Sequence, residues 1–100
     1  MRIIWTPMGL ESLSETSRFI GKSWNEEVVD VFIDRLENRI EQLKKFPEIG
    51  PVYKGTNYRQ LTIHPLVSLY YEVDQDFIYL VLVWANKQDP NELKRKLDQF

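Results

Sequence analysis

The stretch FIYLVLVWANKQDP, Phe77 to Pro90, carries the clearest structural signal in the chain. Its first nine residues are nearly all apolar or aromatic, which is typical of a central strand that is covered on both faces. The polar residues that follow indicate where this strand ends. Asp89, Pro90 and Glu92 then supply a helix N-cap, a first helical residue and an acidic first turn. We therefore predict a central strand followed by a short C-terminal helix, with Leu93, Leu97 and Phe100 on one face.

Three more segments have strand character because they are rich in β-branched and aromatic residues. RQLTI (59–63) and VSLYYEV (67–73) precede the central strand and are separated by HPL and DQD, which are short enough for hairpin-like turns. RIIWT (2–6) begins the chain. These segments predict one small, mostly antiparallel sheet.

A first helix is predicted to begin at Thr6 and Pro7, an N-cap followed by a proline at the first helical position. It is expected to end near Gly21 and Lys22. Its apolar residues recur at intervals of three and seven, which predicts one buried face made of Leu10, Leu13 and Ile20.

A second helix is predicted to begin at Ser23, because Glu26 follows three residues later in a capping-box arrangement. Pro47 is expected to end it, since the residue before a proline avoids the helical region. Its apolar positions recur every three or four residues and are Val29, Phe32, Leu36, Ile40 and Leu43.

The predicted order is β-α-α-β-β-β with a short C-terminal helix. This is an α+β fold in which a helical hairpin packs on a small, mostly antiparallel sheet. One hundred residues predict a single domain that spans residues 1–100.

Composition excludes several classes of function. The formal net charge is −2, so there is no global positive field that would draw the protein onto nucleic acid or an anionic membrane. The chain has no cysteine, which makes a reducing cytoplasm the default compartment. No apolar run is long enough for a membrane span or a signal peptide. We therefore expect a cytoplasmic protein that does not bind DNA directly.

Catalytic and metal-binding patterns are scarce. His64 is the only histidine and stands in the turn sequence IHPL, which favours a turn residue over a catalytic base. No HExxH or EF-hand spacing occurs, and neither a metal nor a cofactor is expected. The acidic residues of the second helix have the spacing of a solvated face, although general acid–base catalysis stays an alternative; they are Glu26, Glu27, Asp30, Asp34, Glu37 and Glu41.

Six basic residues are candidates for binding a partner, because neighbouring strands could bring them to one end or face of the sheet. The alternative is ordinary solubilising charge. The six are Lys54, Arg59, Lys87, Lys94, Arg95 and Lys96.

Four stretches in the same order resemble the RelE/ParE superfamily of toxins from bacterial type II toxin–antitoxin systems. They cover almost the whole chain and are IIWTPMGLESLSE, LKKFPEIGP, YRQLTIHPLVSLYYEV and VWANKQDP. The resemblance implies a small toxin that a cognate antitoxin holds inactive, by docking a helix in a groove beside the helical hairpin and by adding a strand to the sheet edge.

The superfamily divides by mechanism. The resemblance to RelE-like members implies mRNA cleavage on the ribosome by basic residues on the middle strands and after the last strand. Here Arg59 is kept, but the next two positions of that set fall on Leu61 and Ser68. Loss of one electrostatic donor typically costs about 10²–10³ in rate. The candidates that remain for catalysis are Arg59, Lys87 and Lys94.

The sequence therefore favours the ParE-like branch. Resemblance to this branch implies that the protein poisons DNA gyrase through protein contacts. Two alternatives stay open: a ribosome-dependent mRNA endoribonuclease, and a binding module of the same fold that has lost its toxicity.

Overall fold

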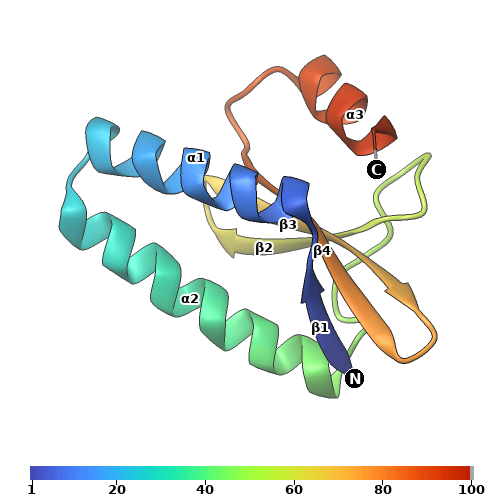
Figure 1. The fold of residues 1–100 in the computed structure, drawn as a ribbon. Coiled ribbons are helices and arrows are strands. Elements are labelled where there is room, and N and C mark those ends of the chain that lie inside the picture. The colour runs from blue at the N-terminus through green and yellow to red at the C-terminus, as the bar shows by residue number, and fades with distance from the viewer. Residues whose placement is uncertain (100) are drawn as a thin grey trace.

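A computed structural model describes residues 1–99. It confirms the predicted α+β order, in which two long helices separate the first strand from the other three and a short helix ends the chain (Figure 1). The elements are β1 (Arg2–Trp5), α1 (Pro7–Ser23), α2 (Glu26–Lys45), β2 (Arg59–His64), β3 (Val67–Asp74), β4 (Phe77–Ala85) and α3 (Pro90–Asp98).

The four strands form one sheet in the order β1-β4-β3-β2. β4 is central, as its apolar sequence predicts, and it pairs antiparallel with β3 and parallel with β1. Tyr70 lies opposite Leu82 and Tyr71 opposite Leu80, so Val81 is an extra residue in β4. This bulge places Val81 and Leu82 in the same buried cluster.

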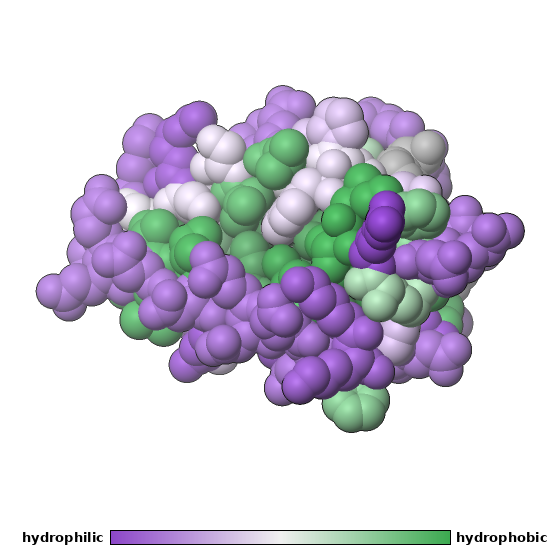
Figure 2. All heavy atoms as spheres, turned by 60° about the horizontal axis from the view of Figure 1, so that its bottom comes forward, coloured by the Kyte–Doolittle hydropathy of each residue, from purple (hydrophilic) through white to green (hydrophobic). Residues whose placement is uncertain are grey.

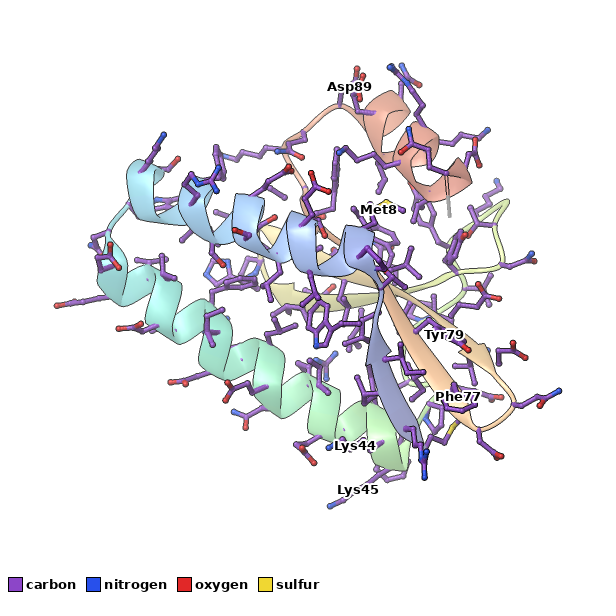
Figure 3. The ribbon with its side chains drawn as sticks, in the orientation of Figure 1. Met8, Lys44, Lys45, Phe77, Tyr79 and Asp89 are labelled. Carbon is purple, nitrogen blue, oxygen red and sulfur yellow. The ribbon has the colours of Figure 1, made fainter. Side chains whose placement is uncertain are left out.

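The sheet separates two apolar clusters. α1 and α2 cover one face and α3 lies over the other (Figure 1). The larger cluster joins buried residues of α2, such as Phe32 and Leu36, to Leu69 and Leu80 of the sheet. The smaller cluster joins Leu93 and Leu97 of α3 to Tyr70, Val81, Leu82 and Trp84, and Met8 of α1 packs against it (Figure 3).

The buried face of α1 differs from the prediction. Leu10 is 54% exposed, and the buried residues are Gly9, Ser12, Thr16 and Ile20. The reason is that α1 approaches β4 very closely: a Cβ atom added to Gly9 would overlap the carbonyl oxygen of Leu80. At this separation only small side chains fit between the helix and the strand near Gly9, whereas Ile20 farther along α1 is buried as predicted.

Hydroxyl groups hold α1 against β4 where apolar side chains are missing. Ser12 Oγ accepts a hydrogen bond from the backbone N–H of Val83 at 2.9 Å, and Thr16 Oγ1 donates to the Val83 oxygen at 3.4 Å. Thr6 Oγ1 donates to the Leu80 oxygen at 3.0 Å and accepts from Gly9 N at 2.9 Å, which confirms Thr6 as the N-cap. These contacts satisfy polar groups that burial would otherwise leave unpaired.

The start of α2 also differs from the prediction. Its N-cap is Asn25, whose side-chain oxygen accepts from Val28 N at 3.0 Å. Ser23 cannot be the N-cap of α2, because it is the last residue of α1. The predicted core positions Phe32, Leu36 and Leu43 are buried, and the helix stops at Lys45, two residues before Pro47, as expected.

α3 begins as predicted. Asp89 Oδ1 accepts from Asn91 N at 2.9 Å, Pro90 is the first helical residue, and Leu93 and Leu97 are buried. Phe100, the third apolar residue predicted for this face, lies outside the described residues. Across residues 1–99, no helix has the length and the apolar character needed to cross a membrane.

Candidate functional site

A polar network lies on the α3 face of the sheet. Gln60 Nε2 donates to Tyr70 OH at 3.0 Å and to Ser68 Oγ at 3.4 Å, and Ser68 Oγ donates to Asn86 Oδ1 at 3.0 Å. A hollow of about 280 Å³ opens over these groups. Its described lining residues are Tyr53, Gln60, Tyr70, Trp84, Asn86, Gln88, Pro90 and Leu93.

This hollow has neutral chemistry, because none of its described lining residues carries a charged side chain near neutral pH. Burial raises the pKa of Tyr70 to about 12, so its phenol stays protonated and cannot act as a base at neutral pH. Phosphoryl transfer needs groups that stabilise developing negative charge and move a proton. The amides and hydroxyls of this network can bind through hydrogen bonds, but they do not supply that charge.

Arg59 binds backbone oxygens of the loop between α2 and β2. Its Nη1 donates to the Gly50 oxygen at 2.8 Å and to the Glu48 oxygen at 3.3 Å. Tyr71 OH holds the same loop by donating to the Pro47 oxygen at 2.8 Å. Since successive strand residues point to opposite faces, Arg59 points away from the face that carries Gln60.

Leu61 and Ser68, the two positions where the ribonuclease pattern is lost, lie on different faces of the sheet. Leu61 is buried in the cluster beneath α2. Ser68 belongs to the polar network on the α3 face. A basic residue at position 61 would therefore be buried in an apolar core.

Lys87 has a different environment from Arg59. It is exposed and lines a hollow of about 240 Å³ together with Phe19 and Trp24. These two aromatic rings are 42% and 46% exposed and meet edge to face, with ring centroids 6.4 Å apart.

The other basic candidates lie elsewhere. Lys94 and Arg95 are exposed on α3, where Arg95 forms an ion pair with Glu92 at 2.6 Å, and Lys96 is partly buried. Lys54 is exposed in the loop before β2. Arg59, Lys87 and Lys94 thus belong to three different surroundings: a loop contact, an aromatic hollow and an exposed helix face.

His64 stabilises its turn. Its Nδ1 accepts from Leu66 N at 3.2 Å, and burial together with Arg35 lowers its pKa below the ordinary histidine value. The carboxylates predicted to form a solvated face of α2 are all exposed. Within the described residues, no three histidine or acidic side chains are grouped so that they could hold a metal ion.

A second candidate surface is an apolar strip along the helical hairpin, and sequence reasoning had assigned part of it to the core. Figure 2 shows apolar residues gathered in a band across this side of the molecule, with hydrophilic residues on both sides. Leu10, on α1, is 54% exposed. We define the apolar strip by its partly buried or exposed residues on β1, α1 and α2, which are Ile3, Leu10, Leu13, Val29, Ile33 and Ile40.

Further apolar surface lies at the C-terminal end of α2, where a hollow of about 640 Å³ is lined partly by Met1, Phe46, Ile49 and Val73. Phe46 is 63% exposed. An exposed apolar surface is a candidate for an interaction site.

The two sheet edges differ in how much room they leave. The outer edge of β2 is partly occupied, because Gln60 N donates to the Pro51 oxygen at 2.9 Å and Arg39 Nε donates to the Thr62 oxygen at 3.2 Å. β1 is the opposite edge strand, and it pairs on one side with β4. Its residue Ile3 belongs to the apolar strip, whereas Ile4 points to the opposite face of the sheet.

Comparison with known proteins assigns the family. Residues 3–90 match the family described as "ParE toxin of type II toxin-antitoxin system, parDE". A solved structure titled "Chromosomal ParDE TA system from P. aeruginosa" shares the fold, with a TM-score of 0.62 and 16% sequence identity over 85% of this chain and 95% of that chain. No curated protein sequence matches. Because the family match covers most of the sequence, this chain belongs to the ParE toxin family of type II toxin–antitoxin systems.

Proposed function

We propose that this protein is a cytoplasmic toxin that poisons DNA gyrase by protein contact and is neutralised by a cognate antitoxin. The observation that supports this most directly is the neutral hollow on the α3 face. A ribonuclease would need cationic groups there to stabilise phosphate charge, whereas a toxin that acts by binding needs none. The favoured function is therefore a binding function.

The antitoxin docks on the apolar strip and at the β1 edge in this proposal. Helix-in-groove docking needs an exposed apolar surface between helices, and strand addition needs an edge with free backbone groups. The strip and β1 are adjacent, so one continuous segment of the antitoxin can use both. The partly occupied edge of β2 is the less suitable of the two edges.

Contact with the target is assigned to the hollow that holds Lys87, Phe19 and Trp24. Exposed aromatic side chains beside a cation are frequent anchors of protein interfaces. Four other basic residues stay proposed contacts to a partner: Lys54, Lys94, Arg95 and Lys96. Arg59 contributes indirectly, because it holds the loop before β2.

The test combines growth with two assays on purified protein. Induced expression without the antitoxin should stop growth, and the purified chain should inhibit DNA supercoiling by gyrase while leaving ribosome-bound mRNA uncut. Trp24→Ala should lower gyrase inhibition, with the exposed Val31→Ala as a control on the outer surface of α2. Cleavage of mRNA that is lost in Tyr70→Phe would overturn the proposal in favour of a ribonuclease. Harmless expression together with unaffected gyrase would leave only a binding module.

A further inference from the structure

Helix α2 carries opposite charges on its two flanks. One flank of α2 carries four carboxylates in a row with Ile33, a residue of the apolar strip. Residues 26, 30, 33, 37 and 41 are three or four positions apart and therefore lie on the same side of the helix. The four carboxylates are Glu26, Asp30, Glu37 and Glu41. All four carboxylates are exposed. We call this row the acidic flank.

The arginines of α2 occupy the other flank, which faces β2. Arg39 Nε donates to the Thr62 oxygen of β2 at 3.2 Å, and Arg35 is close enough to His64 of β2 to affect its charge. The arginines therefore lie away from the strip, whereas the flank that borders the strip carries four carboxylates and, at its C-terminal end, Lys44.

The helix dipole explains only part of this sorting. Carboxylates are favourable in the first turn of a helix and cations in the last turn, which fits Glu26 at the start and Lys44 and Lys45 at the end (Figure 3). Glu37 and Glu41 lie in the second half of α2, where the dipole gives carboxylates no benefit. Among the described residues, the acidic flank has one ion pair, between Glu41 and Lys44 at 2.9 Å.

The opposite border of the strip is neutral. The line of α1 that faces α2 contains Leu10, Leu13, Ser17 and Gly21, and a Cβ atom on Gly21 would touch Val29 of α2 at 3.5 Å. The strip thus has an apolar floor with an acidic border on α2, and the line of α1 that faces α2 carries no charged residue. A segment bound there meets negative charge on one side only.

We propose that the apolar strip binds an amphipathic helix of the antitoxin whose lysine or arginine side chains lie along one flank and pair with the acidic flank of α2. The apolar face of that helix packs on Leu10, Ile33 and Ile40, and its basic flank fixes its orientation across the strip. Charge complementarity of this kind selects among partners and suppresses wrong ones. This inference rests on the proposed antitoxin function and names the chemistry of the partner.

The test compares two double variants that change the net charge equally. Asp30→Lys with Glu37→Lys reverses two charges of the acidic flank. Glu27→Lys with Asp34→Lys reverses one glutamate and one aspartate at exposed positions of the same helix that lie farther round the helix from the strip, on the side of the acidic flank remote from Ile33. Both double variants change the net charge by the same amount, so long-range electrostatics should affect their antitoxin affinity equally. A difference in affinity between the two variants therefore reports the local contact.

The probe is the purified cognate antitoxin, and calorimetric titration of the full chain gives its affinity. The acidic-flank variant should bind at least about tenfold more weakly than the wild type, and its affinity should depend less on salt. The control variant should stay within about threefold of the wild type, as expected for charges outside the contact. Thermal unfolding followed by circular dichroism checks that both variants fold, and Asp30→Asn with Glu37→Gln repeats the test without reversing charge.

A reciprocal change sharpens the result. Replacing the antitoxin's flank lysines and arginines by glutamate should restore binding to the acidic-flank variant and weaken binding to the wild type. Equal affinities of the two double variants, with the wild type still neutralised by the antitoxin, would overturn this inference and leave the proposed function standing. A wild-type protein that neither binds the antitoxin nor inhibits growth would overturn both.

Discussion

The two long helices lie on the same face of one sheet, but they are held there by different chemistry. α2 buries large apolar side chains, with Phe32 and Leu43 fully enclosed. α1 buries glycine, serine and threonine next to β4 and is held by hydroxyl hydrogen bonds. A helix that packs through large side chains stays at a distance from its sheet, whereas a helix that packs through small ones comes close enough to bond with the backbone.

The difference determines which leucines are available to a partner. On α2, apolar residues at helical spacing form the core. On α1, the core face is taken by small residues, and Leu10 points outward into the apolar strip. The same kind of residue is therefore fully buried at Leu36 and Leu43 of α2 and mostly exposed at Leu10 of α1.

The largest expected effect is at the core of α2. Phe32→Ala removes a fully buried aromatic side chain and should lower the free energy of unfolding by about 3–5 kcal/mol. Urea denaturation followed by circular dichroism measures this change. A loss below about 1 kcal/mol would mean that α2 does not anchor the hairpin.

Gly9→Ala tests the close approach of α1. The added methyl group would overlap the Leu80 carbonyl oxygen, which is backbone and cannot rotate away. We expect a loss of about 1–3 kcal/mol in unfolding free energy, although alanine is the better helix former. A protein stabilised by this substitution would show that α1 lies farther from β4.

Ser12→Ala tests the hydroxyl contacts. The substitution leaves the buried N–H of Val83 without its 2.9 Å partner and should cost about 1–3 kcal/mol of unfolding free energy. Ser14→Ala, at an exposed position of the same helix, is the matched control and should change stability by less than about 0.5 kcal/mol. Equal values for the two serines would contradict the importance of the Val83 hydrogen bond.

The smallest expected effect on stability is at Leu10, and it separates folding from recognition. Leu10→Ser should change the unfolding free energy by less than about 0.5 kcal/mol, because the side chain is mostly exposed. The same variant should bind the antitoxin more weakly, since it loses apolar contact on the strip. A large loss of stability with unchanged antitoxin affinity would reverse the assignment.

Much of the fold was predictable because its signals are local. The apolar run of β4, the Thr6-Pro7 start of α1 and the Asp89-Pro90 start of α3 each depend on neighbouring residues alone. The prediction that α2 begins at Ser23 was wrong because α1 extends through Ser23, and Asn25 is the N-cap of α2 instead.

The candidate site was less predictable. The basic residues stood out by their charge, but their contacts depend on which strand face and which loop they reach, as Arg59 shows. The neutral network of Gln60, Ser68, Tyr70 and Asn86 carries no sequence motif, since its members come together only through strand register. Paired strand positions bring Gln60 beside Tyr70, which no local sequence pattern indicates.

The sequence by itself determined the elements, their order and the core of α2, because periodicity and end signals act over a few residues. Only the tertiary structure decided which face of α1 is buried, since the distance between α1 and β4 selects small residues over leucines. It also decided that the acidic residues of α2 lie beside an apolar strip and its arginines beside β2, because that depends on how the whole helix is rotated against the sheet.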